Sequence, residues 1–281
     1  MGVIGIDMGG TNLRAGLVEN GTLLKVESVP IKKNGNESEI LDDIHAIIRN
    51  FESEKISGIG IGVPSVVDIQ RGIVFDVQNI PSWKEVYLKD IIQSKKNVPV
   101  YINNDANCFV VGEKHFGKVK EYANIVGLIV GTGLGAGLVI NNHLYSGANC
   151  GAGEFGMVPF KNHNLEYYCS GQFFSNEYGV TGEEIFHKAE KNDTLAKKIF
   201  DEFGSYLGEA IKVILYTFDP DIIVLGGSVS KSFKYFQKEM WKSINTFAYP
   251  KSLEKLKIEV SEKEHIAILG AAALYYDALQ E

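Results

Sequence analysis

The sequence predicts an α/β protein built from two domains that share one cleft. Apolar runs typical of strands alternate with segments of helical periodicity, which is the pattern of an α/β class. The chain has 281 residues, enough for two hydrophobic cores. A pattern of strand, glycine-rich turn and strand occurs twice, at residues 5–18 and 127–139. Because this separation is far longer than the period of a repeat array, it indicates duplicated domains, each with one glycine turn at the cleft.

The expected elements follow from local patterns. Short runs rich in valine and isoleucine predict strands over 3–8, 13–18, 59–63, 98–102, 125–130, 137–140 and 222–225. Helical periodicity predicts helices over 38–51, 105–116, 195–218 and 266–279. Ser38 is expected to cap the first helix, and Asp219 followed by Pro220 ends the third. The last helix is expected to return to the first domain.

Composition narrows the function classes. Hydrophobic residues make up 45% and charged residues 22%, ordinary values for a globular protein. The net charge of -7 gives no general attraction to nucleic acid or to an anionic membrane. The N-terminus lacks the features of a signal peptide, and no apolar stretch reaches the ~20 residues that span a bilayer. Three widely spaced cysteines fit a reducing compartment, so we expect a cytoplasmic protein.

The two glycine turns are candidate phosphate sites, because glycine lets backbone N–H groups approach an anion closely. The expected nucleotide contacts are Gly9, Gly10, Thr11 and Asn12 in the first turn and Gly131, Thr132 and Gly133 in the second. Asp7 ends the strand before the first turn and would repel phosphate unless a cation lay between them. Mg²⁺, held through water, is the expected bridge. A turn-capping carboxylate is the alternative interpretation of Asp7.

A third glycine pair follows the strand over 222–225. Gly226 and Gly227 could receive an adenosine ring against bare backbone, or they form an ordinary β–α turn. Residues 131–136 also match a dinucleotide fingerprint, but that motif must open a helix, and strand-type residues follow here. A Walker A loop would need Gly-Lys-Ser/Thr, which does not occur. The pattern therefore favours turns that bind ATP in another way.

Further motifs carry a resemblance to a known family. They are Asp7 to Thr11, Gly62 to Asp68, Asn79 with Trp83, Asn104 to Asn107, 131–135, Gly151 to Gly156 and Gly226-Gly227. Together they resemble the ROK (repressor, open reading frame, kinase) family of sugar kinases, within the actin/hexokinase/heat-shock ATPase superfamily. The resemblance covers residues 3 to about 275. It implies two ribonuclease H-like α/β domains with a mixed sheet each and a cleft between them, over 1–113 with 264–281 and over 114–263.

The resemblance also assigns roles. It implies that Asp105 is the general base that accepts a proton from a sugar hydroxyl, with the helix N-terminus keeping it ionised. Simple helix capping is the alternative for Asp105. The expected sugar contacts are Ser65, Asn79, Asn104, Asp105, Glu154 and Glu177. Amide and carboxylate groups suit sugar edges, which carry paired donors and acceptors. The partners are ATP with Mg²⁺ and a hexose, and the resemblance implies a homodimer.

The sequence departs from the family at its zinc motif. Only Cys169 remains where relatives carry several cysteines, so we expect no structural zinc, and Tyr167, Tyr168, Phe173 and Phe174 are expected to replace it by packing. The motif's closing glutamate is either Glu177, with a one-residue insertion, or is replaced by Asn176. Met157 stands where relatives often have histidine. The first strand begins at Val3, so we expect no DNA-binding module before it.

Function alternatives remain open. The expected activity is phosphorylation of O6 of glucose or a related aldohexose, with a fructokinase or an N-acetylhexosamine kinase as the alternative. A non-catalytic sugar sensor on the same fold is the rival from another class, but it has no need of a base at Asp105. A superfamily ATPase that acts on a protein would need no sugar contacts such as Glu154.

Overall fold

The chain forms two compact units that contain both helices and sheets. A computed structural model describes residues 2–52, 54–77 and 80–280. Unit 1 comprises the residues up to Glu121, Gly137–Ala152 and the residues from Glu262; unit 2 comprises Tyr122–Ala136 and Gly153–Ser261. These units differ from the expected domain bounds chiefly at 137–152, which belong to unit 1. The α/β class predicted from the sequence is confirmed.

Unit 1 is built on one mixed sheet. Its described strands are β1 (Gly2–Met8), β2 (Asn12–Glu19), β3 (Thr22–Pro30), β4 (Ile56–Val63), β5 (Val66–Asp68), β6 (Ile73–Phe75), β7 (Glu85–Val86), β8 (Val100–Asn104) and β11 (His143–Leu144). Its helices are α1 (Glu37–Arg49), α2 (Leu88–Lys96), α3 (Asp105–Phe116) and α10 (Ile266–Ala278). The main sheet has the order β3-β2-β1-β4-β8, and β5-β6-β7 form a smaller sheet.

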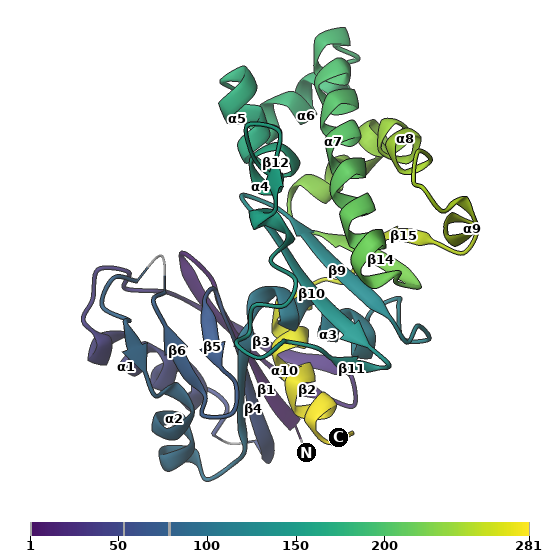
Figure 1. Ribbon diagram of the computed structural model, residues 1–281. Coiled ribbons are helices and arrows are strands. Elements are labelled where there is room, and N and C mark those ends of the chain that lie inside the picture. Colours follow the sequence, from purple (N-terminus) through teal and green to yellow (C-terminus); the bar gives the residue numbers. More distant parts are fainter. Residues whose placement is uncertain (1, 53, 78–79, 281) are drawn as a thin grey trace. The chain divides into compact units, whose positions relative to one another are not determined.

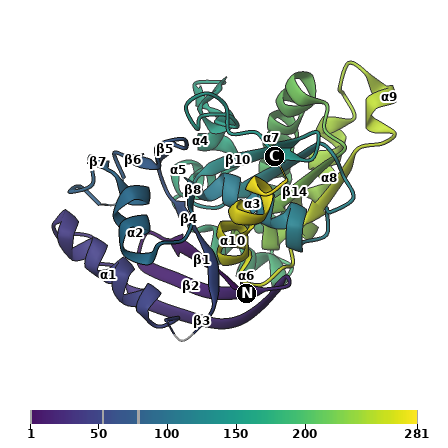
Figure 2. The same ribbon diagram turned by 90° about the horizontal axis from the view of Figure 1, so that it is seen from below.

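Helices cover both faces of the main sheet of unit 1 (Figures 1 and 2). On one face, the apolar stripe of α1 packs with Ile4, Ile6 and Ile61 in a buried core. On the other face, α10 lies so close that a Cβ at Gly5 would sit 2.0 Å from the carbonyl oxygen of Ile268. The close approach explains the small residues on both partners. The last helix returns to the first domain, as predicted.

In unit 1, the capping prediction was wrong and the strand β3 was missed. Ser38 does not cap α1; Asn36 does, because its side chain accepts from Glu39 N while the Glu39 side chain accepts from Asn36 N. The strand β3 was not predicted, because it is an edge strand whose residues are mostly exposed and partly charged. Its sequence therefore lacks the buried apolar run by which the other strands were recognised.

Unit 2 combines a sheet with a helical layer. Its strands are β9 (Ile125–Val130), β10 (Leu134–Ile140, whose end lies in unit 1), β12 (Pro159–Phe160), β13 (His163–Asn164), β14 (Ile222–Gly226) and β15 (Lys257–Val260). Its helices are α4 (Leu165–Cys169), α5 (Gln172–Tyr178), α6 (Gly182–Glu190), α7 (Thr194–Phe218), α8 (Phe233–Ile244), α9 (Pro250–Leu253) and the 3₁₀ turns η1 (Phe155–Met157) and η2 (Val229–Ser232). β14 lies between β9 and β15, parallel to both.

The long helix α7 organises the helical layer of unit 2 (Figure 1). It ends where expected, since Asp219 adopts a left-handed conformation before Pro220. Phe200 and Phe203 on its inner face are fully buried and contact Phe174 of α5. In the described residues, no helix is long and apolar enough to cross a membrane.

Candidate active site

The predicted base lies at the junction of β8 and α3 in unit 1. The Oδ1 atom of Asn104 accepts a hydrogen bond of 2.7 Å from the backbone N–H of Asn107, so Asn104 is the N-cap of α3. Asp105 is the first residue of the helix, and its side chain is exposed. Asn104 therefore performs the capping that was the alternative role for Asp105. The Asp105 carboxylate stands in the first helical turn, where the helix dipole favours its charged form.

Asn103 holds this junction together, although the sequence analysis gave it no role. It is 3% exposed. Its Oδ1 atom accepts from the N–H of Asn104 and from Nδ2 of Asn107, both at 2.9 Å. Its Nδ2 atom donates to Oγ of Ser146 at 3.1 Å. A buried amide with these partners fixes the path of the backbone into Asp105. The three amides and one carboxylate at positions 103, 104, 105 and 107 were the sequence pattern that could have indicated a buried polar network here.

One predicted sugar contact, Ser65, lies in the loop after β4. The hydroxyl of Ser65 donates to the carbonyl oxygen of Phe75, which ties the loop after β4 to β6. A serine hydroxyl bonded in this way still has lone pairs that can accept from a sugar. Asn79 lies outside the described residues.

The first glycine turn connects β1 and β2. The N–H of Gly9 donates to the carbonyl oxygen of Asn12 at 3.0 Å, and Nδ2 of Asn12 donates to Oγ1 of Thr11 at 3.3 Å. Thr11 and Asn12 are exposed at the tip of the hairpin. The predicted strand, turn and strand are therefore present, with polar groups at the tip.

Asp7 is paired with an arginine that the sequence analysis did not consider. The Nε and Nη2 atoms of Arg14 lie 3.1 and 2.5 Å from Oδ2 of Asp7. The two residues are direct cross-strand neighbours of β1 and β2, so the hairpin register was the signal that could have predicted the pair. Burial raises the pKa of Asp7, and Arg14 opposes that rise. Asp7 is thus a buried carboxylate beside the turn, with its charge balanced by Arg14.

The second glycine turn lies in unit 2, after β9. The N–H of Gly131 donates to the carbonyl oxygen of Gly133 at 3.0 Å, and that of Gly171 donates to the carbonyl oxygen of Gly131 at 2.7 Å. As expected, strand β10 follows this turn, which excludes the dinucleotide fingerprint. Gly227 has a φ of +85° and packs so tightly that a Cβ would lie 2.4 Å from the Val130 carbonyl oxygen.

A cavity of about 610 Å³ in unit 2 borders the second glycine turn. Its lining includes Gly131, Thr132, Phe174 and Ser228, with Phe186 of α6. Gly226 and Gly227 immediately precede Ser228 in the chain. The cavity has the size of a small-molecule site, apolar rings on one part and polar groups on another. The contributions of α5 and α6 were not predicted, because they are distant in sequence from every glycine motif.

Glu154 follows a glycine whose conformation the backbone requires. Gly153 has a φ of +95°, and a Cβ there would lie 2.3 Å from the carbonyl oxygen of Ala136. Glu154 is exposed in the turn that begins η1. Although the residue is exposed overall, partial desolvation of its carboxyl group, and next the charge of Glu166, raise the pKa of Glu154. Close backbone packing therefore explains why glycine stands directly before Glu154.

Glu166 is a second carboxylate of this region, and the sequence analysis missed it. Its Oε2 atom accepts from the N–H of Leu134 at 3.0 Å, and its Oε1 atom accepts from Nε2 of Gln172 at 3.1 Å. Gln172 lines the cavity of unit 2. Glu166 thus connects the second glycine turn, the cavity wall and the surroundings of Glu154. Glu166 and Leu134 are 32 positions apart, so no local sequence pattern could have predicted their contact.

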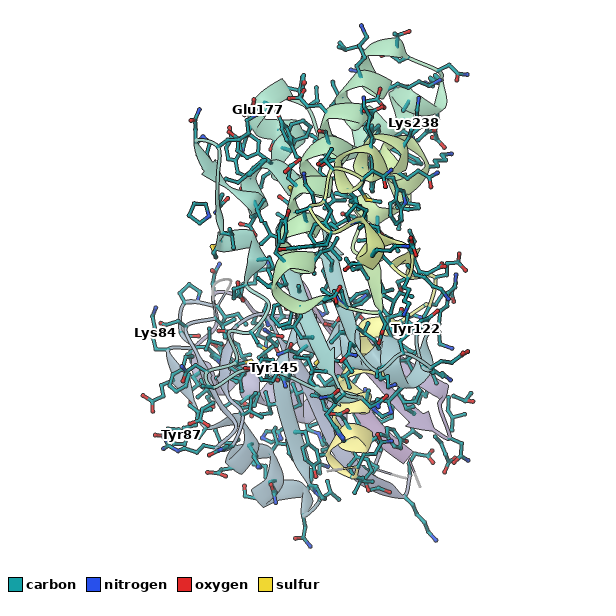
Figure 3. All side chains as sticks on the ribbon, turned by 45° about the vertical axis from the view of Figure 1, so that its right-hand side comes forward. Lys84, Tyr87, Tyr122, Tyr145, Glu177 and Lys238 are labelled. Carbon is teal, nitrogen blue, oxygen red and sulfur yellow. The ribbon has the colours of Figure 1, made fainter. Side chains whose placement is uncertain are left out.

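Asn176 and Glu177, the two candidates for the closing glutamate position, are both exposed on α5. Figure 3 labels Glu177. The hydrogen bond from Tyr167 to Glu177 raises the pKa of Tyr167. The acidic group that influences Glu154 is Glu166, in α4.

Aromatic rings fill the stretch where relatives carry the zinc motif. The ring of Tyr167 stacks on His163 with 3.9 Å between centroids and lies 4.7 Å from that of Tyr168. Phe173 and Phe174 are fully buried and contact each other and Phe203. Cys169 is fully buried, and burial raises its pKa well above the usual range. The expected packing of these rings is confirmed.

The ROK family model matches residues 3–278 of the chain. The chain belongs to the ROK family. It is 28% identical to a glucokinase of Thermotoga maritima, covering 97% of this chain and 96% of that protein. It is 31% identical to a xylose repressor of Bacillus spizizenii, covering 88% of this chain and 69% of that protein. Among solved structures, a ROK family glucokinase from Streptomyces griseus in complex with glucose and AMPPNP has a TM-score of 0.80 and 26% identity, covering 98% and 99% of the two chains.

These matches confirm the family and the actin/hexokinase-type fold that the sequence motifs implied. They include both kinases and repressors, so membership of the ROK family does not by itself assign an activity to this chain.

Proposed function

We propose that the chain is an ATP-dependent hexokinase that transfers the γ-phosphate of ATP to a sugar hydroxyl, O6 of glucose or of a related aldohexose. Asp105 carries the proposal. Its exposed carboxylate stands in the first turn of α3, and Asn104 already caps that helix. A binding protein would not require a carboxylate at this position, whereas a kinase requires a group that accepts the hydroxyl proton.

The nucleotide would use the cavity of unit 2. Gly131 and Thr132 lie at one part of its lining and offer backbone and hydroxyl donors to phosphate. The half-buried ring of Phe186 offers apolar surface to an adenine ring, backed by the buried Phe174. The first turn, with Thr11 and Asn12 exposed at its tip, would supply further phosphate contacts.

The Asp7 carboxylate fits a magnesium ion held through water. Mg²⁺ usually keeps several waters and is bound by one or two carboxylates together with substrate phosphates. Asp7 is buried beside the turn. Both contacting nitrogens of Arg14 bond to the same Asp7 oxygen, Oδ2, which leaves the other carboxylate oxygen for a water ligand of the ion. Bound Mg²⁺ would neutralise charge on the β- and γ-phosphates. The chain's own residues would bind and orient the substrates, and Asp105 would take the proton.

The proposed sugar contacts remain Ser65, Asn79, Asn104 and Glu154, as the family resemblance implies. Glu166 would act on this set indirectly, because its charge raises the pKa of Glu154. Met157 is 53% exposed and cannot provide the hydrogen bond of the histidine found in relatives. A missing polar partner weakens the rejection of analogues, because no buried group is left unpaired by the wrong sugar. Glucose is therefore the proposed substrate, with mannose or N-acetylglucosamine tolerated.

A sugar-responsive regulator is the second candidate, because the chain is 31% identical to a xylose repressor. Such a protein would bind a sugar without turnover. We also propose a cytoplasmic location, because the three cysteines are buried thiols without disulfides. The family resemblance is the basis for proposing a homodimer.

The test is an ADP-release assay on purified protein with ATP, Mg²⁺ and glucose, mannose, fructose, xylose, N-acetylglucosamine and N-acetylmannosamine in turn. Glucose should give the highest kcat/KM. A strong preference for fructose or N-acetylmannosamine with inert glucose would keep the kinase and reject the glucokinase. Sugar binding by calorimetry without ADP release from any sugar would replace the kinase with the regulator.

A further inference from the structure

A second cavity, of about 780 Å³, lies wholly within unit 1. It is bounded by β8, by β5 and the start of α2, by the segment Leu144 to Cys150, and by the end of α10. Ser65, Asn104 and Asp105 are not part of its lining, so it is distinct from the candidate sugar site. Its volume falls within the range of about 300–1,000 Å³ that is usual for small-molecule sites.

The cavity runs along the free edge of β8. Four consecutive residues of this strand, Val100 to Asn103, line it. Successive side chains of a strand point to opposite faces, so four in a row can border one cavity only along the strand edge. β8 is the last strand of its sheet, with β4 on its other side. Backbone N–H and C=O groups of this edge are therefore close to the cavity, as paired donors and acceptors.

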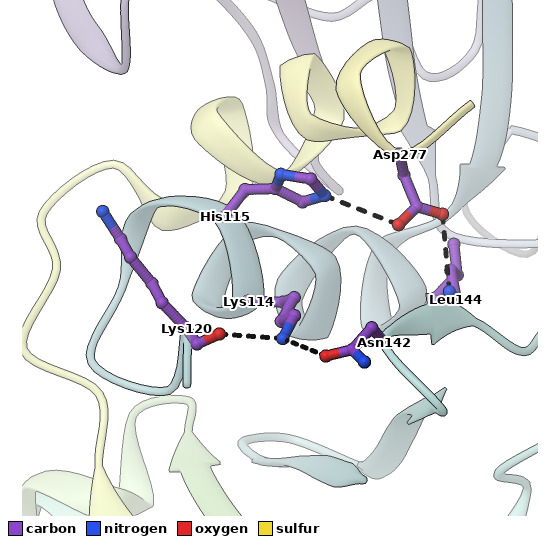
Figure 4. Close-up of polar contacts among 6 residues, drawn as sticks. All are labelled: Lys114, His115, Lys120, Asn142, Leu144 and Asp277. Carbon is purple, nitrogen blue, oxygen red and sulfur yellow. Dashed lines mark hydrogen bonds and ion pairs between the residues drawn. The ribbon is translucent and has the colours of Figure 1, made fainter. Parts of the chain in front are cut away.

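Buried polar side chains add to this edge. Asp277 is 5% exposed, and its carboxylate has long contacts of 3.4 Å to Nε2 of His115 and to the N–H of Leu144 (Figure 4). An ionised carboxylate can accept about four hydrogen bonds, so these two leave capacity for a ligand hydroxyl. The Asn103 amide and the Ser146 hydroxyl, bonded to each other at 3.1 Å, lie in the same lining.

The charge of the lining disfavours an anionic ligand. Among the described residues, its charged members are Asp68, Asp277 and Lys89, two carboxylates against one ammonium group. A phosphate ester would approach both carboxylates. A neutral polyol would instead match carboxylate, amide, hydroxyl and backbone groups, and the rings of Phe75 and Tyr101 in the lining suit the apolar face of a sugar.

We propose that this cavity of unit 1 is a second sugar site, which binds an uncharged monosaccharide and acts on the candidate active site as an effector site. The binding itself rests on the lining described above. Only its effect on turnover rests on the proposed kinase activity.

Two segments that line the cavity are adjacent in sequence to predicted sugar contacts. Asn103 precedes Asn104 and Asp105, and its Oδ1 atom also accepts from Sγ of Cys150 at 3.2 Å. Cys150 closes the segment Leu144 to Cys150, and Glu154 follows four residues later. A sugar that competes with Ser146 for Nδ2 of Asn103 would therefore act on both segments through one amide.

The experiment measures how many sugars one chain binds. Equilibrium dialysis with radiolabelled glucose, and separately with xylose, would compare wild type, Ala148→Trp and Ala248→Trp without ATP. Ala148 is exposed in the cavity lining, so the indole would fill the cavity without disturbing the core. Ala248 is an exposed alanine of unit 2 and is the matched control. Ala278→Trp fills the same cavity from α10 and serves if Ala148→Trp does not fold.

We expect wild type and Ala248→Trp to bind two glucose molecules per chain and Ala148→Trp to bind one. Excess glucose 6-phosphate should displace only the sugar that Ala148→Trp retains. If the candidate sugar site of the proposed function binds no sugar but the second site exists, wild type binds one sugar and Ala148→Trp none. Equal stoichiometry in wild type and in both cavity variants, with either sugar, would overturn the second site. Displacement of its sugar by glucose 6-phosphate would overturn its preference for an uncharged ligand.

Discussion

Replacing Asp105 by asparagine tests the proposed chemistry with little change to the structure. Asn104, not Asp105, caps α3, with 2.7 Å between its Oδ1 atom and the Asn107 nitrogen. The substitution keeps size and shape and removes one charge from the first helical turn. The free energy of unfolding should therefore fall by only about 0.3–1 kcal/mol, the usual value of a charge near a helix end. Sugar affinity should also change little, since an amide can still hydrogen-bond a hydroxyl.

Turnover should fall much more than stability. Loss of a general base typically costs about 10²–10⁴-fold in rate. At about 1.36 kcal/mol per tenfold, this raises the activation free energy by about 2.7–5.4 kcal/mol. The assay is steady-state ADP release with glucose, together with glucose affinity by calorimetry and unfolding in urea. We expect kcat to fall at least about 10²-fold while the dissociation constant of glucose stays within about tenfold.

Asp90→Asn is the matched control, because Asp90 lies in the first turn of α2, away from the candidate site. It should change stability by a similar amount and leave kcat unchanged. A kcat of Asp105→Asn within about threefold of wild type would refute the assignment of Asp105 as the base.

The remaining predictions concern backbone packing, pH, metal content and specificity. Gly153→Ala should destabilise the fold by about 1–3 kcal/mol more than Gly179→Ala, because its Cβ would collide with Ala136 O while the space at Gly179 is open; urea unfolding of both variants checks this. His45 is buried, and burial lowers its pKa from 6.5. Its contribution to stability is therefore present above pH 6.5 and is lost as the pH falls below that value. The free energy of unfolding in urea should differ less between about pH 5 and about pH 8 in His45→Leu than in wild type. Activity should require Mg²⁺ or Mn²⁺ with no bound zinc, and elemental analysis that finds one zinc per chain would contradict the interpretation of the aromatic packing around Tyr167. Values of kcat/KM for glucose and its best competitor should lie within about two orders of magnitude, and steady-state kinetics that give a wider gap would show that Met157 does not relax specificity.

Features encoded by neighbouring residues could be predicted from the sequence. The strand, glycine turn and strand at the start of the chain was one of them, because apolar alternation and glycines are local signals. The helix that begins at Asp105 was another, with bounds that agree with the structure. The motifs that identify the ROK family are also local, and the family match confirmed them.

Three features of unit 1 were missed because local sequence signals were ambiguous or absent. Ser38 and Asn36 are both good capping residues, and the choice depended on whether Glu39 could complete a reciprocal pair. The edge strand β3 carries too many exposed and charged residues to resemble the buried strands. Arg14 lies within the first glycine repeat, and its pairing with Asp7 required the hairpin register.

Only the tertiary structure decided which distant groups meet. Glu166 bonds to Leu134, and Asn103 bonds to Ser146 and Cys150, across 32, 43 and 47 positions of sequence. The cavity of unit 2 likewise collects residues of α5, α6 and η2 around the second glycine turn. Local propensities determine that a segment forms a helix or a strand. They carry no information on which two segments pack together, since that depends on burying complementary apolar faces and pairing the polar groups left between them.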